Sequence, residues 1–207
     1  MKNNKTFSNK QSLYLFLKRI LDILFSIVLI PTCFLLIWWW VFIINLFVTK
    51  WRPFYCPLRY GKNKRVFHIL KFRTMPIGTV EIPPFCLTDD QQKSMCTWFG
   101  KFLRSSSIDE TPQFINVLLG QMSFIGPRPC SLKNEEDLIN YRYSYIPNPF
   151  LLKPGITGYA QVKMNRGHNP KDKAYFDYFY TSNISLKIDI KIVCFTLIRL
   201  LGLMKGK

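Results

Sequence analysis

A long apolar run without a charged residue extends from Ile23 to Val48. About 20 apolar residues are enough to cross the roughly 30 Å hydrocarbon core of a bilayer, so this run has the length of a membrane helix. The three consecutive tryptophans at positions 38–40 suit the headgroup region. The run is too long and too aromatic for a cleaved signal peptide. We therefore predict a membrane-associated helical segment over residues 1–50 and rank the core helix of a soluble protein well below it.

The charges that flank this run bear on how it meets the membrane. Lys18 and Arg19 precede it, Lys50 and Arg52 follow it, and Pro31 interrupts it. Basic flanks favour the cytoplasm, whereas a straight span would place one basic pair outside. Proline removes a backbone donor and bends a helix. The pattern therefore favours a re-entrant helix that bends at Pro31 and returns, with a tilted, kinked transmembrane helix as the alternative.

The rest of the chain mixes shorter patterns. Tyr60–Asn63 predicts a turn, Val66–Phe72 alternates partly as a strand does, and Thr79–Leu87 predicts a loop. The expected fold class is α+β and mostly helical, with the proline-broken N-terminal helix, surface amphipathic helices and a small β element around the functional site. Apolar residues at helical spacing predict helices over Gln91–Leu103, Pro112–Leu119, Ser131–Tyr145, Lys171–Thr181 and Leu186–Met204, the last with a strong apolar face.

Composition and charge narrow the choice of partners. The 207-residue chain is 48% hydrophobic, which suffices for a packed core, and its formal net charge is +17. Such an excess of positive charge indicates an anionic partner: nucleic acid, an acidic membrane surface or a phosphorylated substrate. The six cysteines form no C-x-x-C pair, and the two histidines stand at no zinc-like spacing. These counts argue against a zinc site or a disulfide scaffold and favour reduced thiols on the cytoplasmic side.

The sequence S-I-D-E-T-P-Q, residues 107–113, is the strongest candidate for chemistry. It places Asp109 and Glu110 just before a helix that Thr111 and Pro112 are expected to begin. A carboxylate can attack phosphorus, and a metal bound by its neighbour would neutralise a diphosphate. The alternative is structural, because S-x-x-E from Ser107 to Glu110 also matches a helix capping box.

Basic residues nearby could bind phosphate. Arg128 protrudes from the proline-fixed turn G-P-R-P and can grip a phosphate with two parallel hydrogen bonds. Lys71 and Arg73 alternate with an aromatic residue, and Arg104 precedes the two acids. Taken singly, each has a plainer interpretation: an ordinary turn, a strand with one basic face, or a surface charge.

Taken together, these residues make the chain resemble the bacterial sugar transferases, monotopic phosphoglycosyl transferases that use polyprenyl phosphate. The resemblance extends from Lys18 to about Ile192, and its motifs are weak singly but specific in order and spacing. The matching pieces are Arg59-x-Gly61, Lys71-Phe72-Arg73-Thr74-Met75, Leu103-Arg104, Ser107-Ile108-Asp109-Glu110, Pro112-Gln113, Gly126-Pro127-Arg128-Pro129, Lys153-Pro154-Gly155-Ile156-Thr157-Gly158, Ala160-Gln161-Val162, Asp177 with Tyr180, and Asp189.

The resemblance implies a two-step phosphoryl transfer. The family's aspartate attacks the phosphate that bears the sugar in a UDP-sugar, UMP leaves, and polyprenyl phosphate then takes the phosphosugar from the enzyme. Asp109 matches the nucleophile, and Glu110 matches the second acid, which would hold an essential Mg²⁺. The matching substrate-binding positions are Lys71, Arg73, Arg104, Pro127, Arg128 and Pro129.

The chain departs from the family pattern at three places. Ile30 precedes the proline where many relatives have serine, and Gln121 stands where an aspartate is common. The usual G-R-N after Ala160-Gln161-Val162 is replaced by residues 163–167, and we transfer no function to that loop. The resemblance otherwise implies the short form of the family, with residues 51–207 as a cytoplasmic catalytic domain that ends in an amphipathic helix.

The same resemblance implies where the enzyme acts in the cell and which kind of glycan it helps to make. The enzyme would act at the cytoplasmic face of the bacterial inner membrane and start a capsule, O-antigen or exopolysaccharide. Its partners would be a UDP-sugar, polyprenyl phosphate and the inner leaflet, without nucleic acid. The transferred sugar and the oligomeric state, a homodimer included, stay open. The rivals are a non-catalytic, basic membrane-anchored binding module and a degenerate transferase; the carboxylate pair argues against both, and the chain has no recognised nucleic-acid motif.

Overall fold

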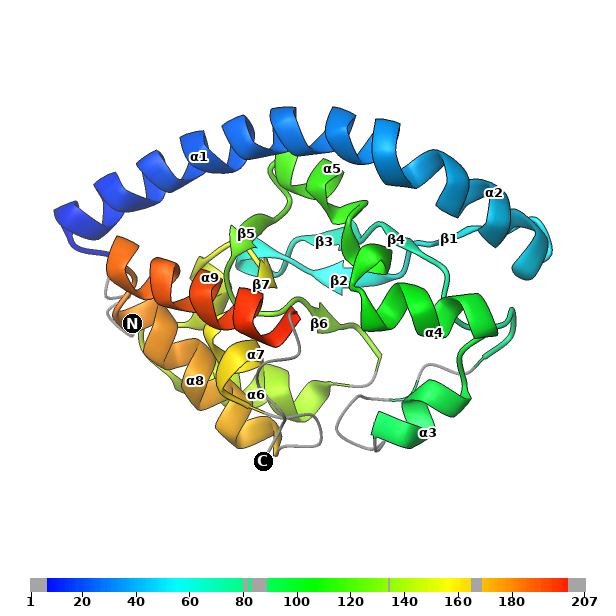
Figure 1. Cartoon of the computed structure of the whole chain (residues 1–207). Helices are drawn as coiled ribbons and strands as arrows, with labels where there is room; N and C mark the ends of the chain where they lie inside the picture. Colours follow the sequence, from blue (N-terminus) through cyan, green and yellow to red (C-terminus); the bar gives the residue numbers. More distant parts are fainter. Residues whose placement is uncertain (1–6, 80–81, 83–88, 134, 165–168, 201–207) are drawn as a thin grey trace.

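The computed structural model describes residues 7–79, 82, 89–133, 135–164 and 169–200. In this part of the chain helices predominate and strands are few and short, which confirms the predicted mostly helical α+β fold. One long helix arches over the molecule, with small sheets beneath it and shorter helices around them (Figure 1). Most of the predicted loop at Thr79–Leu87 lies outside the described residues.

The arch, as we call residues 9–48, consists of α1 (Asn9–Cys33), a π-helical segment (Phe34–Trp38) and α2 (Trp39–Val48). Pro31 lies inside α1 and lacks a backbone donor, and wider π-helical turns follow it. The helix therefore continues past the proline in a shallow curve, whereas the sequence favoured a chain that folds back there (Figure 1). Within the described residues, the arch is the one helix that is long and apolar enough to cross a membrane.

A buried polar cluster attaches the N-terminal end of the arch to the domain below. Lys18 Nζ forms an ion pair with Asp189 of α9 (Leu186–Leu200). The hydroxyls of Tyr14 and Tyr180 donate to the same carboxylate at 2.6 Å and 2.7 Å. Because every charge and hydroxyl in this cluster has a partner, it can be buried without a large desolvation penalty.

Further contacts attach the middle and the other end of the arch. Arg19 donates to the carbonyl oxygens of Val117 and Leu118, at 2.6 Å and 2.9 Å, at the end of α5 (Gln113–Leu118). Asn45 Nδ2 donates to the carbonyl oxygens of Pro53 and Arg73 at 2.7 Å and 3.0 Å. Both ends of the arch thus rest on one and the same domain.

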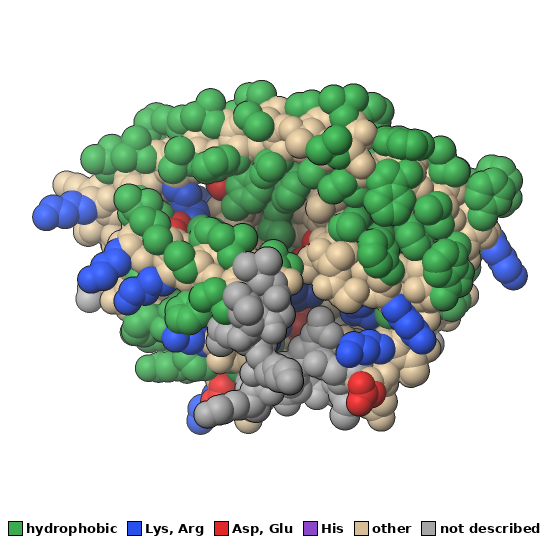
Figure 2. Space-filling view, viewed as in Figure 1, with side chains coloured by type: hydrophobic (Ala, Val, Ile, Leu, Met, Phe, Trp, Pro, Cys, Tyr) green, Lys and Arg blue, Asp and Glu red, His purple; other side chains and the backbone are tan. Residues whose placement is uncertain are grey.

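The outward side of the arch is an exposed apolar surface. Figure 2 shows hydrophobic side chains along its length. A continuous patch of this kind marks a surface that meets a membrane or a protein partner. Exposed apolar side chains of the arch include Leu13, Phe16, Ile20, Leu24, Ile27, Val28, Leu35, Leu36, Trp39, Ile43 and Phe47.

The strands of the described residues form small sheets beneath the arch. β1 (Phe54–Tyr55) pairs antiparallel with β4 (Lys71–Phe72). β2 (Leu58–Tyr60) pairs antiparallel with both β3 (Val66–His68) and β6 (Cys130–Ser131). β5 (Ser123–Ile125) and β7 (Gly155–Thr157) are parallel. The predicted turn at Tyr60–Asn63 joins β2 to β3 and is confirmed.

The remaining helices differ from the predicted ones at their ends. The predicted helix over Gln91–Leu103 is divided, because Thr97 turns the chain and its Oγ1 caps the second part by accepting from Gly100 N at 2.9 Å. The helix expected from Ser131 starts later, because Ser131 belongs to β6. The helix predicted over Lys171–Thr181 is confirmed, and the one predicted from Leu186 is confirmed as far as Leu200, since residues 201–204 lie outside the described residues. The bounds are α3 (Asp89–Ser94), α4 (Trp98–Ser105), α6 (Glu136–Ser144), α7 (Tyr159–Lys163), α8 (Pro170–Ser182) and α9 (Leu186–Leu200).

We predict that Gly100→Ala lowers stability, because α4 approaches the strand segment after β4 at this glycine. An added Cβ would lie 2.0 Å from the carbonyl oxygen of Thr74, and a backbone atom cannot move away as a flexible side chain would. Overpacking of this kind costs about 1–3 kcal/mol, which exceeds the gain of about 1 kcal/mol from replacing a helical glycine by alanine. The melting temperature of the purified protein in detergent should fall by several degrees.

The control for this prediction is Lys101→Ala at the next, exposed position of the same helix. Its melting temperature should stay close to that of the unaltered protein. A Gly100→Ala protein that melts at the same or a higher temperature would contradict the close approach.

Candidate active site

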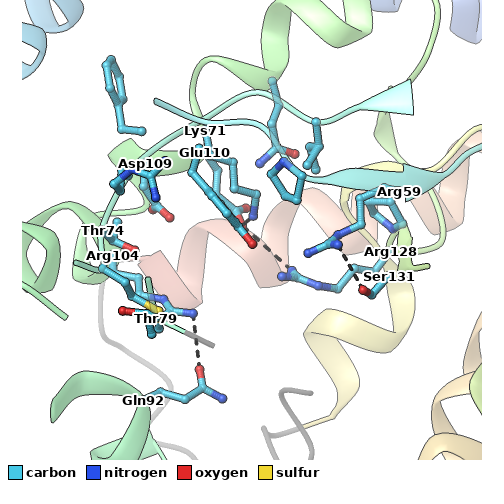
Figure 3. A pocket seen from close by; sticks show the side chains of 18 of the residues that line it. Arg59, Lys71, Thr74, Thr79, Gln92, Arg104, Asp109, Glu110, Arg128 and Ser131 are labelled. Carbon is cyan, nitrogen blue, oxygen red and sulfur yellow. Dashed lines mark hydrogen bonds and ion pairs between the residues drawn. The ribbon is translucent and has the colours of Figure 1, made fainter. Parts of the chain in front are cut away.

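A pocket beneath the arch brings together most of the charged residues singled out from the sequence (Figure 3). Its walls are formed by β4, α3, α4, the short 3₁₀ turn Ile108–Glu110 and the G-P-R-P turn before β6. The predicted residues that line it are Lys71, Arg73, Arg104, Asp109, Glu110, Arg128 and Pro129.

The two carboxylates stand on the 3₁₀ turn rather than on a helix cap. Ser107 adopts the left-handed region, with a φ of 57°, and its side chain caps nothing. The capping-box alternative is therefore excluded. Thr111 does not cap α5 either, because its hydroxyl donates to Ile108 O at 2.9 Å and accepts from Trp38 Nε1 at 2.8 Å. The helix expected to begin at Thr111 and Pro112 is therefore short, with six residues and no side-chain cap.

Glu110 is held ionised by two cations. Its Oε1 lies 2.7 Å from Lys71 Nζ and 4.0 Å from Arg128 Nη1. Burial alone would raise the pKa of this carboxyl, but the charges of Lys71 and Arg128 outweigh it and lower the pKa to about 2. Glu110 is therefore an anion throughout the physiological range.

Asp109 is buried, with 7% of its surface exposed, and its charge is less well compensated. Desolvation, followed by the negative charge of Glu110, raises its pKa to about 6, while Lys71, Arg104 and Arg128 act in the opposite direction. The sequence argument anticipated the cations but not the desolvation. The result is a carboxylate that is ionised at neutral pH and poorly solvated, which is favourable for a nucleophile.

The two predicted arginines that precede the acids differ in orientation. Arg104 extends from α4 into the pocket, where its guanidinium lies 3.5 Å from Gln92 Oε1 and 3.4 Å from Cys96 Sγ (Figure 3). Arg73, in contrast, donates to the carbonyl oxygens of Arg52 and Phe54 at 2.9 Å and 3.0 Å. Its guanidinium is therefore bonded to the backbone of β1 and the residues before it, and a role for Arg73 in gripping phosphate stays a prediction.

The G-P-R-P turn is fixed by hydrogen bonds to its backbone oxygens as well as by its prolines. The backbone oxygen of Pro127 accepts from Gly155 N at 2.9 Å, and Pro127 itself is not among the pocket-lining residues. Pro129 does line the pocket. The backbone oxygen of Arg128 accepts from Arg142 Nη2 at 2.9 Å, so the turn is anchored directly behind the side chain that enters the site.

Arg142 belongs to a buried ion pair that the sequence did not reveal. Its guanidinium bonds to Asp177 of α8, with a 3.0 Å contact from Nε, and to Cys130 Sγ at 2.8 Å. Desolvation would lower the pKa of the guanidinium, yet Asp177 raises it overall and keeps the charge. Removing one partner of such a pair typically costs about 3–5 kcal/mol, so this contact fixes the base of the G-P-R-P turn.

Sequence reasoning missed other members of the pocket. Arg59 of β2 donates to Ser131 Oγ at 3.2 Å (Figure 3). Gln113 lines the pocket with 2% of its surface exposed, and its side-chain nitrogen has no hydrogen-bond partner among the described residues. The R-x-G and P-Q motifs contained both residues. The sequence did not show that β2 pairs with β6, and this pairing brings Arg59 beside the G-P-R-P turn.

The carboxylate pair fits the Mg²⁺ that the resemblance implies. No group of three or more His, Cys, Asp or Glu side chains suited to a metal occurs in the described residues. Mg²⁺ commonly takes one or two protein carboxylates and completes its shell with water and substrate phosphates. Glu110, the acid to which the resemblance assigns the metal, lines the pocket beside Asp109, so a carboxylate of the required kind is present.

A comparison with family models places the chain among known proteins. The model described as bacterial sugar transferase matches residues 13–202.

Curated relatives carry related names. The UDP-glucose:undecaprenyl-phosphate glucose-1-phosphate transferase of Xanthomonas campestris pv. campestris is 38% identical over 161 residues, which cover 72% of this chain and 31% of the relative. The UDP-N-acetylgalactosamine-undecaprenyl-phosphate N-acetylgalactosaminephosphotransferase of Aeromonas hydrophila is 34% identical, and the match covers 87% of this chain and 43% of the relative. The undecaprenyl-phosphate galactose phosphotransferase of Salmonella typhimurium is 33% identical, and the match covers 86% of this chain and 39% of the relative. The chain thus spans less than half the length of these relatives.

We predict that Asp109→Asn stabilises the protein in metal-free buffer. Because the folded pKa of about 6 exceeds the ordinary value of 3.8, ionising Asp109 costs folding free energy that grows as pH rises towards 6 and is constant well above it. The substitution should raise the free energy of unfolding by about 2–3 kcal/mol at pH 8 and by about half as much at pH 5. Chemical denaturation at the two pH values measures both.

Asp172→Asn is the matched control, since it removes an exposed carboxylate from α8. It should change the free energy of unfolding by no more than about 0.5 kcal/mol. An Asp109→Asn protein that is less stable than the unaltered protein at pH 8 would show that Asp109 is not under electrostatic strain.

Proposed function

The chain belongs to the bacterial sugar transferase family, and we propose that it transfers a sugar 1-phosphate from a UDP-sugar to polyprenyl phosphate. The observation that carries the proposal is the pair Asp109 and Glu110, which lies with Lys71, Arg104 and Arg128 in one cationic pocket. Burial raises the pKa of Asp109, whereas Lys71 and Arg128 lower that of Glu110. Two adjacent carboxylates with separated pKa values are typical of groups with distinct catalytic roles. The names of the relatives support the substrate class.

In the first step, Asp109 would attack the phosphorus that bears the sugar. A carboxylate oxygen forms the new P–O bond while the bond to the UMP oxygen breaks, and UMP leaves with that electron pair. The aspartate then carries the phosphosugar as an acyl phosphate. Lys71, Arg104 and Arg128 are positioned to stabilise the non-bridging oxygens, on which negative charge accumulates in the transition state.

In the second step, a phosphate oxygen of the polyprenyl phosphate would attack the same phosphorus. The bond to Asp109 breaks, the carboxylate is regenerated, and a polyprenyl diphosphate sugar leaves. Glu110 is the residue that would hold Mg²⁺, and the bound metal would supply charge neutralisation for the diphosphate. Lys71 keeps Glu110 ionised and therefore able to accept the metal.

Attachment of the arch at both ends supports a monotopic arrangement. Lys18 and Asn45 bind the same domain from opposite ends of the apolar stretch. A straight crossing would therefore pull the domain into the hydrocarbon, where its polar groups would be desolvated. We infer that the apolar side of the arch enters one leaflet and that both ends stay on the cytoplasmic side, as UDP-sugar supply requires.

We predict a covalent intermediate in the absence of lipid. Purified protein incubated with Mg²⁺ and UDP-glucose, UDP-galactose or UDP-N-acetylgalactosamine should gain the mass of one phosphosugar and release UMP with at least one of them. Asp109→Asn should lose both signals, because the amide is not a nucleophile towards phosphorus. Intact-protein mass spectrometry and a UMP assay measure the two outcomes.

Asp172→Asn again serves as the charge-matched control and should react as the unaltered protein does. If no UDP-sugar in a broad panel yields an adduct or UMP, the rival account of a basic membrane-anchored binding module is supported instead.

We also predict that both ends of the arch are labelled from one side of the membrane. Single cysteines at Lys10 and Lys50, introduced into a cysteine-free background, should react with an impermeant maleimide in inside-out vesicles and remain unlabelled in spheroplasts. Lys171→Cys on α8 reports the side of the domain. Opposite labelling of positions 10 and 50 would establish a true span and refute the monotopic arrangement.

A further inference from the structure

A second, smaller pocket lies beneath the N-terminal half of the arch. It is lined by residues of α1, the Lys62–Lys64 turn, β5, the segment before β7 and the junction of α8 with α9. None of its lining residues also lines the catalytic pocket. The two pockets adjoin a pair of parallel strands: β5 lines the second pocket with Ser123 and Ile125, and β7 lines the catalytic pocket with Gly155 and Ile156. Figure 2 shows basic side chains in the hollow between the arch and α9.

Positive charge predominates in this second pocket. Lys18, Arg19, Lys62 and Lys153 line it, whereas Asp22 is its one lining carboxylate among the described residues. Lys18 is paired with Asp189. For Lys62 and Lys153, the described residues provide no carboxylate within ion-pair distance.

Two of these cations converge on a single point. A Cβ built on Gly120, whose φ is +79°, would lie 3.2 Å from Arg19 Nη2 and 3.4 Å from Lys153 Nζ. Arg19 is fixed there by the carbonyl oxygens of Val117 and Leu118. The ammonium of Lys153 thus lies near a second cation, and its side chain is partly buried.

Such an arrangement is costly without an anion. Partial burial, and then repulsion from Arg19 and Lys62, lowers the pKa of Lys153, while Asp22 compensates only in part. Asp22 also accepts a hydrogen bond from Phe124 N at 3.1 Å, so part of its capacity is used by the backbone. A phosphate in the pocket would relieve the repulsion and would bind with charge-assisted hydrogen bonds.

We propose that this pocket binds the phosphate group of an anionic membrane phospholipid, separately from the catalytic pocket. The other side of its lining is apolar, with Leu15, Leu152 and Ile184. An amphiphile matches both halves, since its headgroup meets the cations while its chains follow the exposed apolar face of α1. The pocket would then fix the height and tilt of the N-terminal end of the arch at the membrane surface.

Native mass spectrometry of the full chain tests this proposal without using catalysis, so its outcome is independent of UMP release. The protein is transferred from non-ionic detergent micelles that contain phosphatidylglycerol or, separately, phosphatidylcholine. We expect one retained phosphatidylglycerol per chain and no retained phosphatidylcholine. Lys153→Met should retain phosphatidylglycerol about fivefold more weakly, the factor expected when one basic side chain near an anionic lipid is lost.

Control variants separate charge from folding. Lys153→Arg keeps the charge and should retain the lipid, whereas Lys62→Met, at an exposed position, should weaken retention without affecting the fold. Lys171→Met removes an exposed lysine from α8 and should behave as the unaltered protein.

Either of two results would overturn the proposal. Equal retention by the unaltered protein, by Lys153→Met and by Lys62→Met would show that the pocket does not hold the lipid. Displacement of phosphatidylglycerol by millimolar inorganic phosphate would show that the site binds a free anion, not a membrane lipid.

Discussion

Desolvation of Asp109 is the constraint on which the arrangement of the site depends. A buried carboxylate stays ionised at neutral pH only while cations lie near it, and here they come from β4, α4 and the turn before β6. Sheets of two or three short strands are too small to stabilise a domain alone. Their pairings instead bring these distant segments together, and the buried Arg142–Asp177 pair then holds the turn that carries Arg128.

The segment that carries the two carboxylates is also attached to the arch. Trp38 Nε1 donates to Thr111 directly after the carboxylates, and Arg19 binds the carbonyl oxygens at the end of α5. The 3₁₀ turn and α5 are therefore held at both ends by a helix whose other side is apolar. Because the arch continues through Pro31 without a sharp break, the two attachments belong to one relatively stiff element.

Local patterns predicted much of this molecule. The helical spacing located α8 and α9, the Tyr60–Asn63 turn was evident, and the motif residues Lys71, Arg104, Asp109, Glu110 and Arg128 do meet in one pocket.

The sequence could not predict features that depend on distant pairing or burial. The bond from Arg73 to the backbone of β1 follows from the pairing of β1 with β4. The use of the Thr111 hydroxyl follows from a tryptophan far along the chain, and the raised pKa of Asp109 follows from burial. With its apolar side in one leaflet, as proposed, an arch secured at both ends would keep the pocket at a constant distance from the bilayer. The proposed polyprenyl phosphate acceptor would then reach the pocket by lateral diffusion alone, and turnover would depend on how densely that acceptor populates the leaflet.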